Sequence, residues 1–218
     1  MTDSWIPAHL RRRARTALVV VVLIAAGRAI SDGGYPHDPG RASAPGAYAG
    51  ALGPDAPPPA PSLPSAVPAR LKIPAIDVDA PLTGLGRDAD NTLVPPPPDD
   101  ANLAGWDRGG VAPGSTGTAV VAGHYDTSHG PAAFYGLHAL EPGSEVRVAR
   151  ADGRTAVFTV GAVEEYEKEE FPSEKVYRHS ARAELRLITC GGSFSKDGGY
   201  SANTVVYAYL TGVVRTRP

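Results

Sequence analysis

The sequence predicts an all-β domain, built either as a barrel or as a sandwich, and three observations support this. Short apolar runs recur from residue 70 to residue 212, and several of them alternate apolar with polar residues. The chain contains 25 Gly and 22 Pro in 218 residues, and many of these separate the runs. Only 132–140 and 173–179 have a helical pattern. Many short strands joined by Gly and Pro turns are typical of barrels and sandwiches.

The strands are expected from apolar alternation and from β-branched residues. In chain order they lie at 71–73, 78–82, 117–123, 145–148, 154–163, 184–189 and 203–210. Residues 164–170 form an acidic run, which we interpret as a solvated loop or strand end; the alternative is a loop modulated by a cation. No internal repeat is present.

Composition limits the partners. The net charge is −2 and 42% of residues are hydrophobic, so the chain has no bias toward polyanions and we expect no nucleic-acid partner. Aromatic residues make up 7% of the chain, which indicates one modest core. We expect that core in a single domain at 70–218, a size typical of independent domains.

The N-terminal residues 1–31 have the pattern of a basic tail followed by a membrane anchor or a signal segment. Four arginines at 11–15 precede an apolar run at 17–27, and Arg28 comes directly after it. A basic flank before an apolar run directs export of the chain beyond that run. We favour an uncleaved anchor; a cleaved signal peptide and a plain buried helix are the alternatives. Either exporting interpretation predicts that the domain at 70–218 lies on the extracellular face of the cell membrane.

Residues 32–69 are rich in Pro, Gly and Ala, and we interpret them as a spacer. This composition buries little apolar surface and favours extended polyproline II. Fully extended, the segment would reach roughly 100 Å. A proline-rich ligand for a groove-type module is the alternative.

Cys190 is the only cysteine, and it ends the expected strand at 184–189, just before Gly191 and Gly192. An exported single cysteine either stays a free thiol or pairs between molecules. Nucleophilic chemistry with a histidine partner is one reason to keep a free thiol. The alternative is a buried cysteine that acts as a small apolar side chain.

His124 ends the expected strand at 117–123 much as Cys190 ends another. Neighbouring strands that finish on the same rim would bring imidazole and thiol together, and a nearby imidazolium lowers the pKa of a thiol. The alternative for His124 is a half-buried histidine bonded to a backbone carbonyl. His129, in a loop five residues beyond, could line the same cleft. No spacing of histidines resembles a zinc site, so we expect neither metal nor cofactor.

The residues Leu187-Ile188-Thr189-Cys190 and Gly123-His124-Tyr125-Asp126 resemble the cysteine and histidine segments of sortases. The 66-residue spacing between His124 and Cys190 and the layout of basic tail, apolar run, spacer and β domain also suit that family. The opening at 71–74, the Pro113-Gly114 turn and the Cys190-Gly191-Gly192 step are most similar to class F sortases of actinobacteria. The resemblance covers roughly residues 70–212.

The resemblance implies a closed eight-stranded β-barrel with one or two short helices and a cysteine transpeptidase activity. The Cys190 thiolate would attack the Thr–Gly bond of an LPxTG-type sorting signal, and an amine of a peptidoglycan precursor would resolve the thioester. His124 would act as acid and base. Thr189, Gly191, Tyr125 and His129 would contact the substrate.

One departure from the family affects the oxyanion site. Sortases carry an arginine at the start of the strand that comes after the cysteine, and this chain has no arginine between Cys190 and Val205. Asn203 occupies roughly that position, and an amide can donate to an oxyanion. We expect Asn203 to serve there; an arginine from elsewhere (Arg108 or Arg182), Lys196, or loss of the function are the alternatives.

Two other functions remain open. A hydrolase would cleave the same signal and pass the acyl group to water. A wall-facing binding domain would keep the barrel without activity. The chain lacks the Ser-His-Gly-Cys pattern of L,D-transpeptidases and the Cys-Gly-Ser-Cys-Trp pattern of papain-like proteases.

Overall fold

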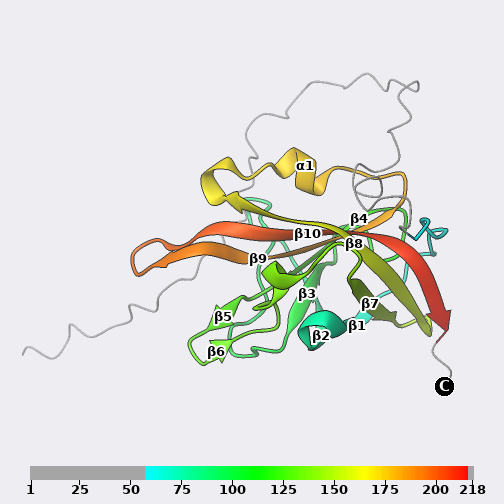
Figure 1. Cartoon of the computed structure of the whole chain (residues 1–218), viewed down its shortest axis with the longest axis horizontal. Helices are drawn as coiled ribbons and strands as arrows, with labels where there is room; N and C mark the ends of the chain where they lie inside the picture. The colour runs from blue at the N-terminus through cyan, green and yellow to red at the C-terminus, as the bar shows by residue number, and fades with distance from the viewer. Residues whose placement is uncertain (1–56, 216–218) are drawn as a thin grey trace, which may run out of the picture.

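A computed structural model of the chain describes residues 57–215, in which eight strands close into a barrel (Figure 1). The expected anchor, and the expected spacer up to residue 56, lie outside the described residues. The elements are β1 (Pro68–Ile73), η1 (Pro74–Ile76), β2 (Val78–Leu85), β3 (Ala104–Asp107), β4 (Gly117–Gly123), β5 (Asp126–Thr127), β6 (Gly130–Pro131), η2 (Leu137–Ala139), β7 (Glu145–Arg150), β8 (Arg154–Glu167), η3 (Lys168–Glu170), α1 (Ser173–Tyr177), β9 (Ala183–Ser195) and β10 (Gly199–Arg215).

Around the barrel the strands lie in the order β1-β2-β3-β4-β9-β10-β8-β7. Two neighbouring pairs, β2–β3 and β4–β9, are parallel, and the others are antiparallel. The short strands β5 and β6 form a separate ribbon. The predicted all-β class with a closed eight-stranded barrel and few helices is confirmed.

The alternation of β9 shows why this sequence forms a barrel wall. Leu185 and Leu187 point into the interior core, where they pack with residues of the other strands such as Val121. Ile188 lies on the outer face, in a second apolar cluster with Val120 and other residues under α1. Both faces of β9 are therefore buried in this part of the strand. Burial on both faces explains why apolar residues occur at successive positions of β9.

The predicted elements differ from the structure in several places. Strand β9 does not end at Cys190 as expected but continues to Ser195, and β10 is longer than expected at both ends. The strand expected at 154–163 continues to Glu167, because its residues 164–167 pair with β10. The segment 132–140 contains only the 3-10 turn η2 rather than a longer helix. Strand β3 was not predicted, since its four residues are too few to show a period.

The end of the expected spacer packs against the barrel. The Ala60 amide donates to the Leu210 carbonyl at 2.8 Å, and the Leu63 amide donates to the Gly114 carbonyl at 2.7 Å. The Tyr209 hydroxyl donates to the carbonyl of Pro57 at 3.1 Å. Residues 57–63 form no regular secondary structure, but these hydrogen bonds hold them against the barrel wall (cyan in Figure 1).

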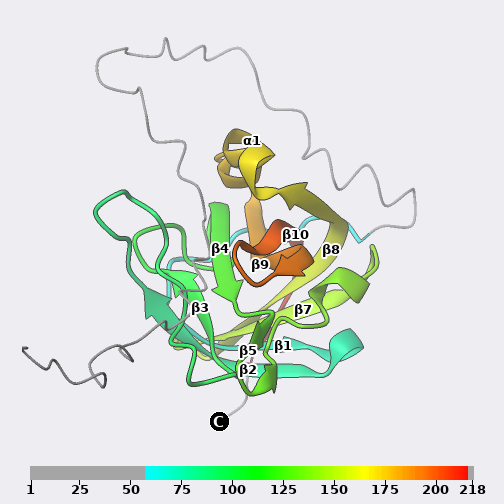
Figure 2. The same ribbon diagram turned by 90° about the vertical axis from the view of Figure 1, so that its left-hand side faces the viewer.

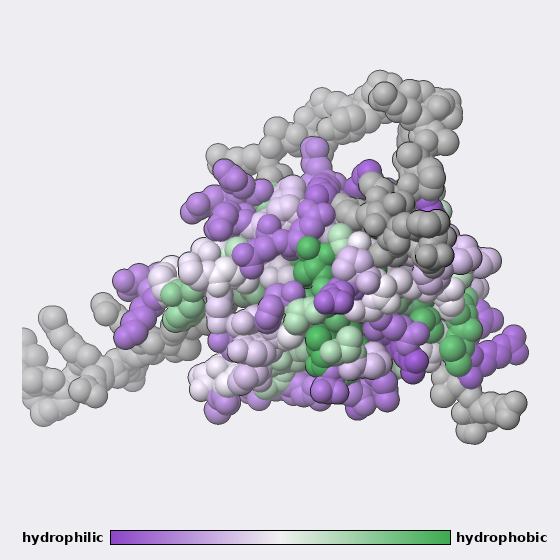
Figure 3. Space-filling view, in the orientation of Figure 1, coloured by the Kyte–Doolittle hydropathy of each residue, from purple (hydrophilic) through white to green (hydrophobic). Residues whose placement is uncertain are grey.

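Polar residues dominate much of the surface. The face seen in Figure 3 is mainly hydrophilic, with a narrow apolar strip. Among the described residues, no helix combines the length and the apolar character needed to cross a bilayer.

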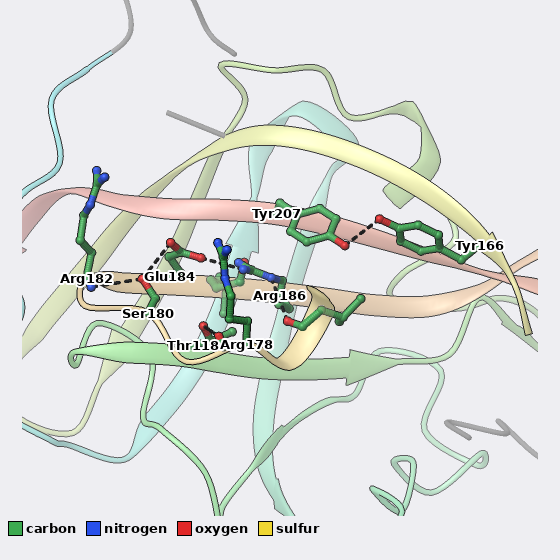
Figure 4. Close-up of polar contacts among 10 residues, drawn as sticks. Thr118, Tyr166, Arg178, Ser180, Arg182, Glu184, Arg186 and Tyr207 are labelled. Carbon is green, nitrogen blue, oxygen red and sulfur yellow. Dashed lines mark hydrogen bonds and ion pairs between the residues drawn. The ribbon is translucent and has the colours of Figure 1, made fainter. Parts of the chain in front are cut away.

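A buried ion pair lies on the outer face of β9, beneath α1 (Figure 4). Glu184 accepts from Arg186 Nη2 at 2.6 Å and from the Ser180 hydroxyl at 2.8 Å. Arg186 Nε donates to the carbonyl of Val176 in α1 at 3.2 Å, and its guanidinium lies 4.6 Å from the Tyr207 ring centroid. These contacts attach α1 to the barrel wall.

We predict that Glu184→Gln lowers the free energy of unfolding by roughly 3 kcal/mol, because it leaves the buried Arg186 cation without its counter-charge. Chemical denaturation of the variant measures this. Glu174→Gln, at an exposed position of α1, is the matched control. Equal stability of the two variants would show that the ion pair does not hold α1.

Candidate functional site

His124 directly follows the last residue of β4, and Cys190 lies within β9, five residues before that strand ends. The two strands run parallel, with Val121 opposite Leu187 and Ala122 opposite Ile188. One more step sets Gly123 against Thr189, and the Thr189 hydroxyl donates to the Gly123 carbonyl at 2.9 Å. Continued by one more residue, the same register puts His124 level with Cys190. The imidazole and the thiol thus share one end of the barrel, here named the Cys190 rim.

The Cys190 rim is the end from which the β9–β10 hairpin projects, as Figure 2 shows end-on. Cys190 lies two residues after Ile188, and His124 lies two residues after Ala122, so continued alternation puts both on the outer face. Asn203 of β10 pairs directly with Cys190, and Tyr166 of β8 pairs with Asn203. The side chains opposite one another on neighbouring strands share a face. Cys190, Asn203 and Tyr166 therefore form a row on one face across β9, β10 and β8, and His124 continues that row just beyond the end of β4.

Burial dominates the electrostatics of the thiol. Cys190 is free and 4% exposed, yet it belongs to neither apolar core cluster. Burial raises the pKa of the Cys190 thiol above its ordinary value, the positive charge of Lys168 opposes this, and Asp126 reinforces it. The expectation that the thiol's pKa is lowered is therefore wrong for this conformation, because desolvation outweighs the nearby cation.

His124 contacts a backbone carbonyl, as its alternative interpretation expected. The imidazole is 7% exposed, and its Nε2 lies 2.7 Å from the carbonyl oxygen of the buried Pro96. A carbonyl only accepts, so Nε2 carries the proton and Nδ1 is the other ring nitrogen. Sequence reasoning missed Pro96. The available signal was the run of four prolines at 95–98, which offers carbonyl acceptors and no amide donors.

Asn203 is fully buried, and neither its Oδ1 nor its Nδ2 has a hydrogen-bond partner among the described residues. A buried amide without partners costs about 1–3 kcal/mol, so such a group calls for a functional explanation. Its place opposite Cys190 gives one, because its N–H can donate to the oxyanion that forms on a carbonyl oxygen when the sulfur adds to that carbonyl carbon.

The arginines considered as alternatives lie far from Cys190. Arg182 precedes β9, eight residues before Cys190, and a strand of that length spans roughly 26 Å. Arg108 comes after β3, whose Ala104 is the residue level with Gly123, so it lies roughly 13 Å further along the wall. Lys196 lies exposed at the tip of the β9–β10 hairpin.

The two glycines after Cys190 allow β8, β9 and β10 to approach closely. A Cβ on Gly191 would lie 2.6 Å from the Thr204 hydroxyl and 2.8 Å from Glu165 Oε2. Gly192 has φ +75°, a left-handed conformation that favours glycine, and its amide donates to Glu165 Oε2 at 3.0 Å. Part of the acidic run thus fixes the chain just beyond the cysteine.

The residues predicted to contact the substrate differ in their surroundings. Thr189 is buried and its hydroxyl holds Gly123, which makes it a support for the site. Tyr125 packs against Tyr135 and Tyr200, with ring centroids 4.7 and 5.3 Å away. His129 is exposed in the β5–β6 turn, where its Nδ1 lies 3.3 Å from the Ser128 hydroxyl.

Within residues 57–215, no group of three or more His, Cys, Asp or Glu side chains is arranged to hold a metal ion.

Known proteins resemble this chain in sequence pattern and in fold. The family model described as the sortase domain matches residues 71–211, more than half of the chain. The structure resembles sortase A of Listeria monocytogenes, with a TM-score of 0.52 at 17% identity over 70% of this chain and 92% of that one. It also resembles the SrtA sortase of Actinomyces oris, with a TM-score of 0.52 at 21% identity over 76% and 93%. No curated protein matches the chain.

We predict that Lys168→Gln moves the midpoint of Cys190 alkylation to higher pH. Lys168 lowers the pKa of the thiol, so its removal raises that pKa and leaves less thiolate at any pH below the midpoint. Iodoacetamide alkylation monitored by mass across a pH series measures this. Lys196→Gln is the matched control, and identical midpoints in the two variants would show that Lys168 does not act on the thiol.

Proposed function

Because the chain belongs to the sortase family of cysteine transpeptidases, we propose that it cleaves LPxTG-type sorting signals and joins the released carboxyl group to a cell-wall amine. The observation that carries this proposal is the register that pairs Cys190 with Asn203 and that, continued past the end of β4, puts His124 level with Cys190. It supplies a nucleophile, a proton carrier and a neutral donor on one face of one rim.

The reaction takes the usual order for a covalent cysteine enzyme. The Cys190 thiolate adds to the carbonyl carbon of the signal's threonine. The carbonyl oxygen becomes negatively charged and accepts a hydrogen bond from the Asn203 side-chain N–H. The C–N bond then breaks as the His124 imidazolium gives its proton to the departing glycine amine. An acceptor amine loses a proton to His124, attacks the thioester and releases the thiol.

Burial of the thiol sets a condition on this scheme. Cys190 is 4% exposed, so a substrate reaches the sulfur only when neighbouring groups shift. Its raised pKa means that the thiol is mainly protonated at neutral pH in this conformation. Binding of a peptide that brings the threonine carbonyl and excludes water would then select the minor thiolate form.

The docked segment suggests an orientation for a tethered enzyme. Residues 57–63 meet the barrel near Leu210, seven residues along β10 from Asn203, which is roughly 23 Å. We place the catalytic domain outside the cell membrane, on the sequence of the basic tail and apolar run at 11–28. The Cys190 rim would then face away from the tether and toward wall and client proteins. The class F assignment rests on the sequence motifs alone.

Incubation of the chain with a panel of sorting-signal peptides and an amine, and then mass measurement of the products, tests the proposal. A peptide joined to the amine supports the transpeptidase. A peptide ending in a free threonine carboxylate with amine present would favour the hydrolase. Absence of both products and of any adduct would favour a binding domain.

We predict that Cys190→Ala abolishes the thioester adduct and that His124→Ala lowers the acylation rate by about 10²–10⁴-fold, the usual contribution of acid–base catalysis. Single-turnover mass measurements give both values. His179→Ala, an exposed histidine between α1 and β9, is the matched control and keeps wild-type rates. Normal acylation in the His124 variant would remove His124 from the mechanism.

We predict that Asn203→Ala lowers kcat by about 10²-fold with little change in KM, because an oxyanion donor acts mainly in the transition state. Asn102→Ala, which removes an amide from an exposed loop, is the control. Turnover close to wild type in the Asn203 variant would reject the oxyanion role.

A further inference from the structure

The contact between His124 and Pro96 joins two segments 28 residues apart in sequence. Pro96 belongs to the loop between β2 and β3, in the run of four prolines at 95–98. Within that run Pro96 is buried, whereas Pro97 and Pro98 are exposed. The carbonyl of Pro96 therefore lies inside the site, 2.7 Å from the imidazole Nε2, while the next residues remain at the surface.

Resting on the proposed function, we propose that the Pro96 carbonyl is the positioning group of His124, the third member of a Cys–His–carbonyl arrangement. Acid–base histidines are commonly oriented by a third group, which fixes the tautomer and stabilises the imidazolium. Here the carbonyl holds the proton on Nε2 and leaves Nδ1 as the nitrogen that exchanges protons with sulfur and with the substrate amines.

A proline run suits this task. Proline has no amide N–H, and its fixed φ keeps the segment extended, so little backbone freedom is lost when the carbonyl is aimed at the ring. Pro96 has no backbone-to-backbone hydrogen bond of its own outside the strands of the described part of the chain. The carbonyl is thus available to the imidazole.

The titratable groups around the site leave the orienting role to this carbonyl. Asp126, two residues after His124, accepts from the Tyr200 hydroxyl at 2.5 Å. Lys168, beyond the end of β8, acts on Cys190, and Glu165 accepts from the Gly192 amide. No carboxylate is hydrogen-bonded to His124 among the described residues.

The test weakens the carbonyl without moving its neighbours. Replacing the exposed Pro97 by the α-hydroxy acid of alanine turns the Pro96 carbonyl from an amide into an ester, which is a weaker acceptor. Pro97→Ala is the matched reference, because it has the same side chain and keeps the amide. Both are made in the full-length chain and compared for thermal unfolding, kcat with a sorting-signal peptide, and histidine tautomer.

We expect the ester to lower kcat by about fivefold to tenfold relative to Pro97→Ala, the effect of weakening one hydrogen bond. In ¹⁵N-histidine spectra, with His124→Gln used for assignment, Pro97→Ala should show the Nε2–H tautomer of His124 and the ester variant a smaller share of it. A purely structural contact would not shift the tautomer while leaving the unfolding temperature unchanged.

Two results would overturn the proposal. An Nδ1–H tautomer of His124 in Pro97→Ala contradicts it directly. Equal or higher kcat in the ester variant would mean that the carbonyl caps the imidazole and must leave it before reaction. The spectra do not depend on activity, so an enzyme that forms no acyl adduct would reject the proposed function and still leave the tautomer measured.

Discussion

The parallel pairing of β4 with β9, extended by the hydrogen bond from Thr189 to the Gly123 carbonyl, is the constraint on which the site depends. Side chains on strands reverse face with every residue, so a slip of one position would send either the imidazole or the thiol into the barrel. The buried hydroxyl of Thr189 resists such a slip, because losing its partner would leave a polar group unsatisfied. The relative position of the imidazole and the thiol therefore depends on the register of β4 against β9.

Neutral groups occupy positions where charge is common in acyl-transfer sites. We expect the amide Asn203 at the position where sortases carry an arginine, and the carbonyl of Pro96 contacts His124, where a carboxylate often orients a histidine. Both are almost or fully buried, and burying an unpaired ion costs several kcal/mol. A neutral set avoids that cost. Desolvation is then the main influence on the pKa of the Cys190 thiol, and the positive charge of Lys168 opposes it.

The sequence predicted the barrel, and it made Cys190 and His124 candidates for the site, because both the strands and these residues leave local marks. Strand alternation marks the wall, His124 directly follows Gly123 at the end of β4, and Cys190 precedes two glycines within β9. Other features leave no local mark in the sequence. The contact of Pro96 with His124 depends on how the loop between β2 and β3 packs against the Cys190 rim. The direction in which the pKa of the thiol shifts depends on its burial. The packing of residues 57–63 on the wall was missed for the same reason, since a proline-rich composition does not reveal what lies beside it.

The central claim is that imidazole and thiol work as one acid–base pair, and the leaving group tests it most directly. A sorting-signal peptide with an amide after threonine is compared with one whose departing group is an alcohol, joined through an ester, which needs less help from an acid. Acylation is measured in single turnover at a pH where the thiol is ionised. His124→Gln should slow the amide about 10²-fold or more while slowing the ester far less. Equal slowing of both substrates would contradict proton transfer by His124.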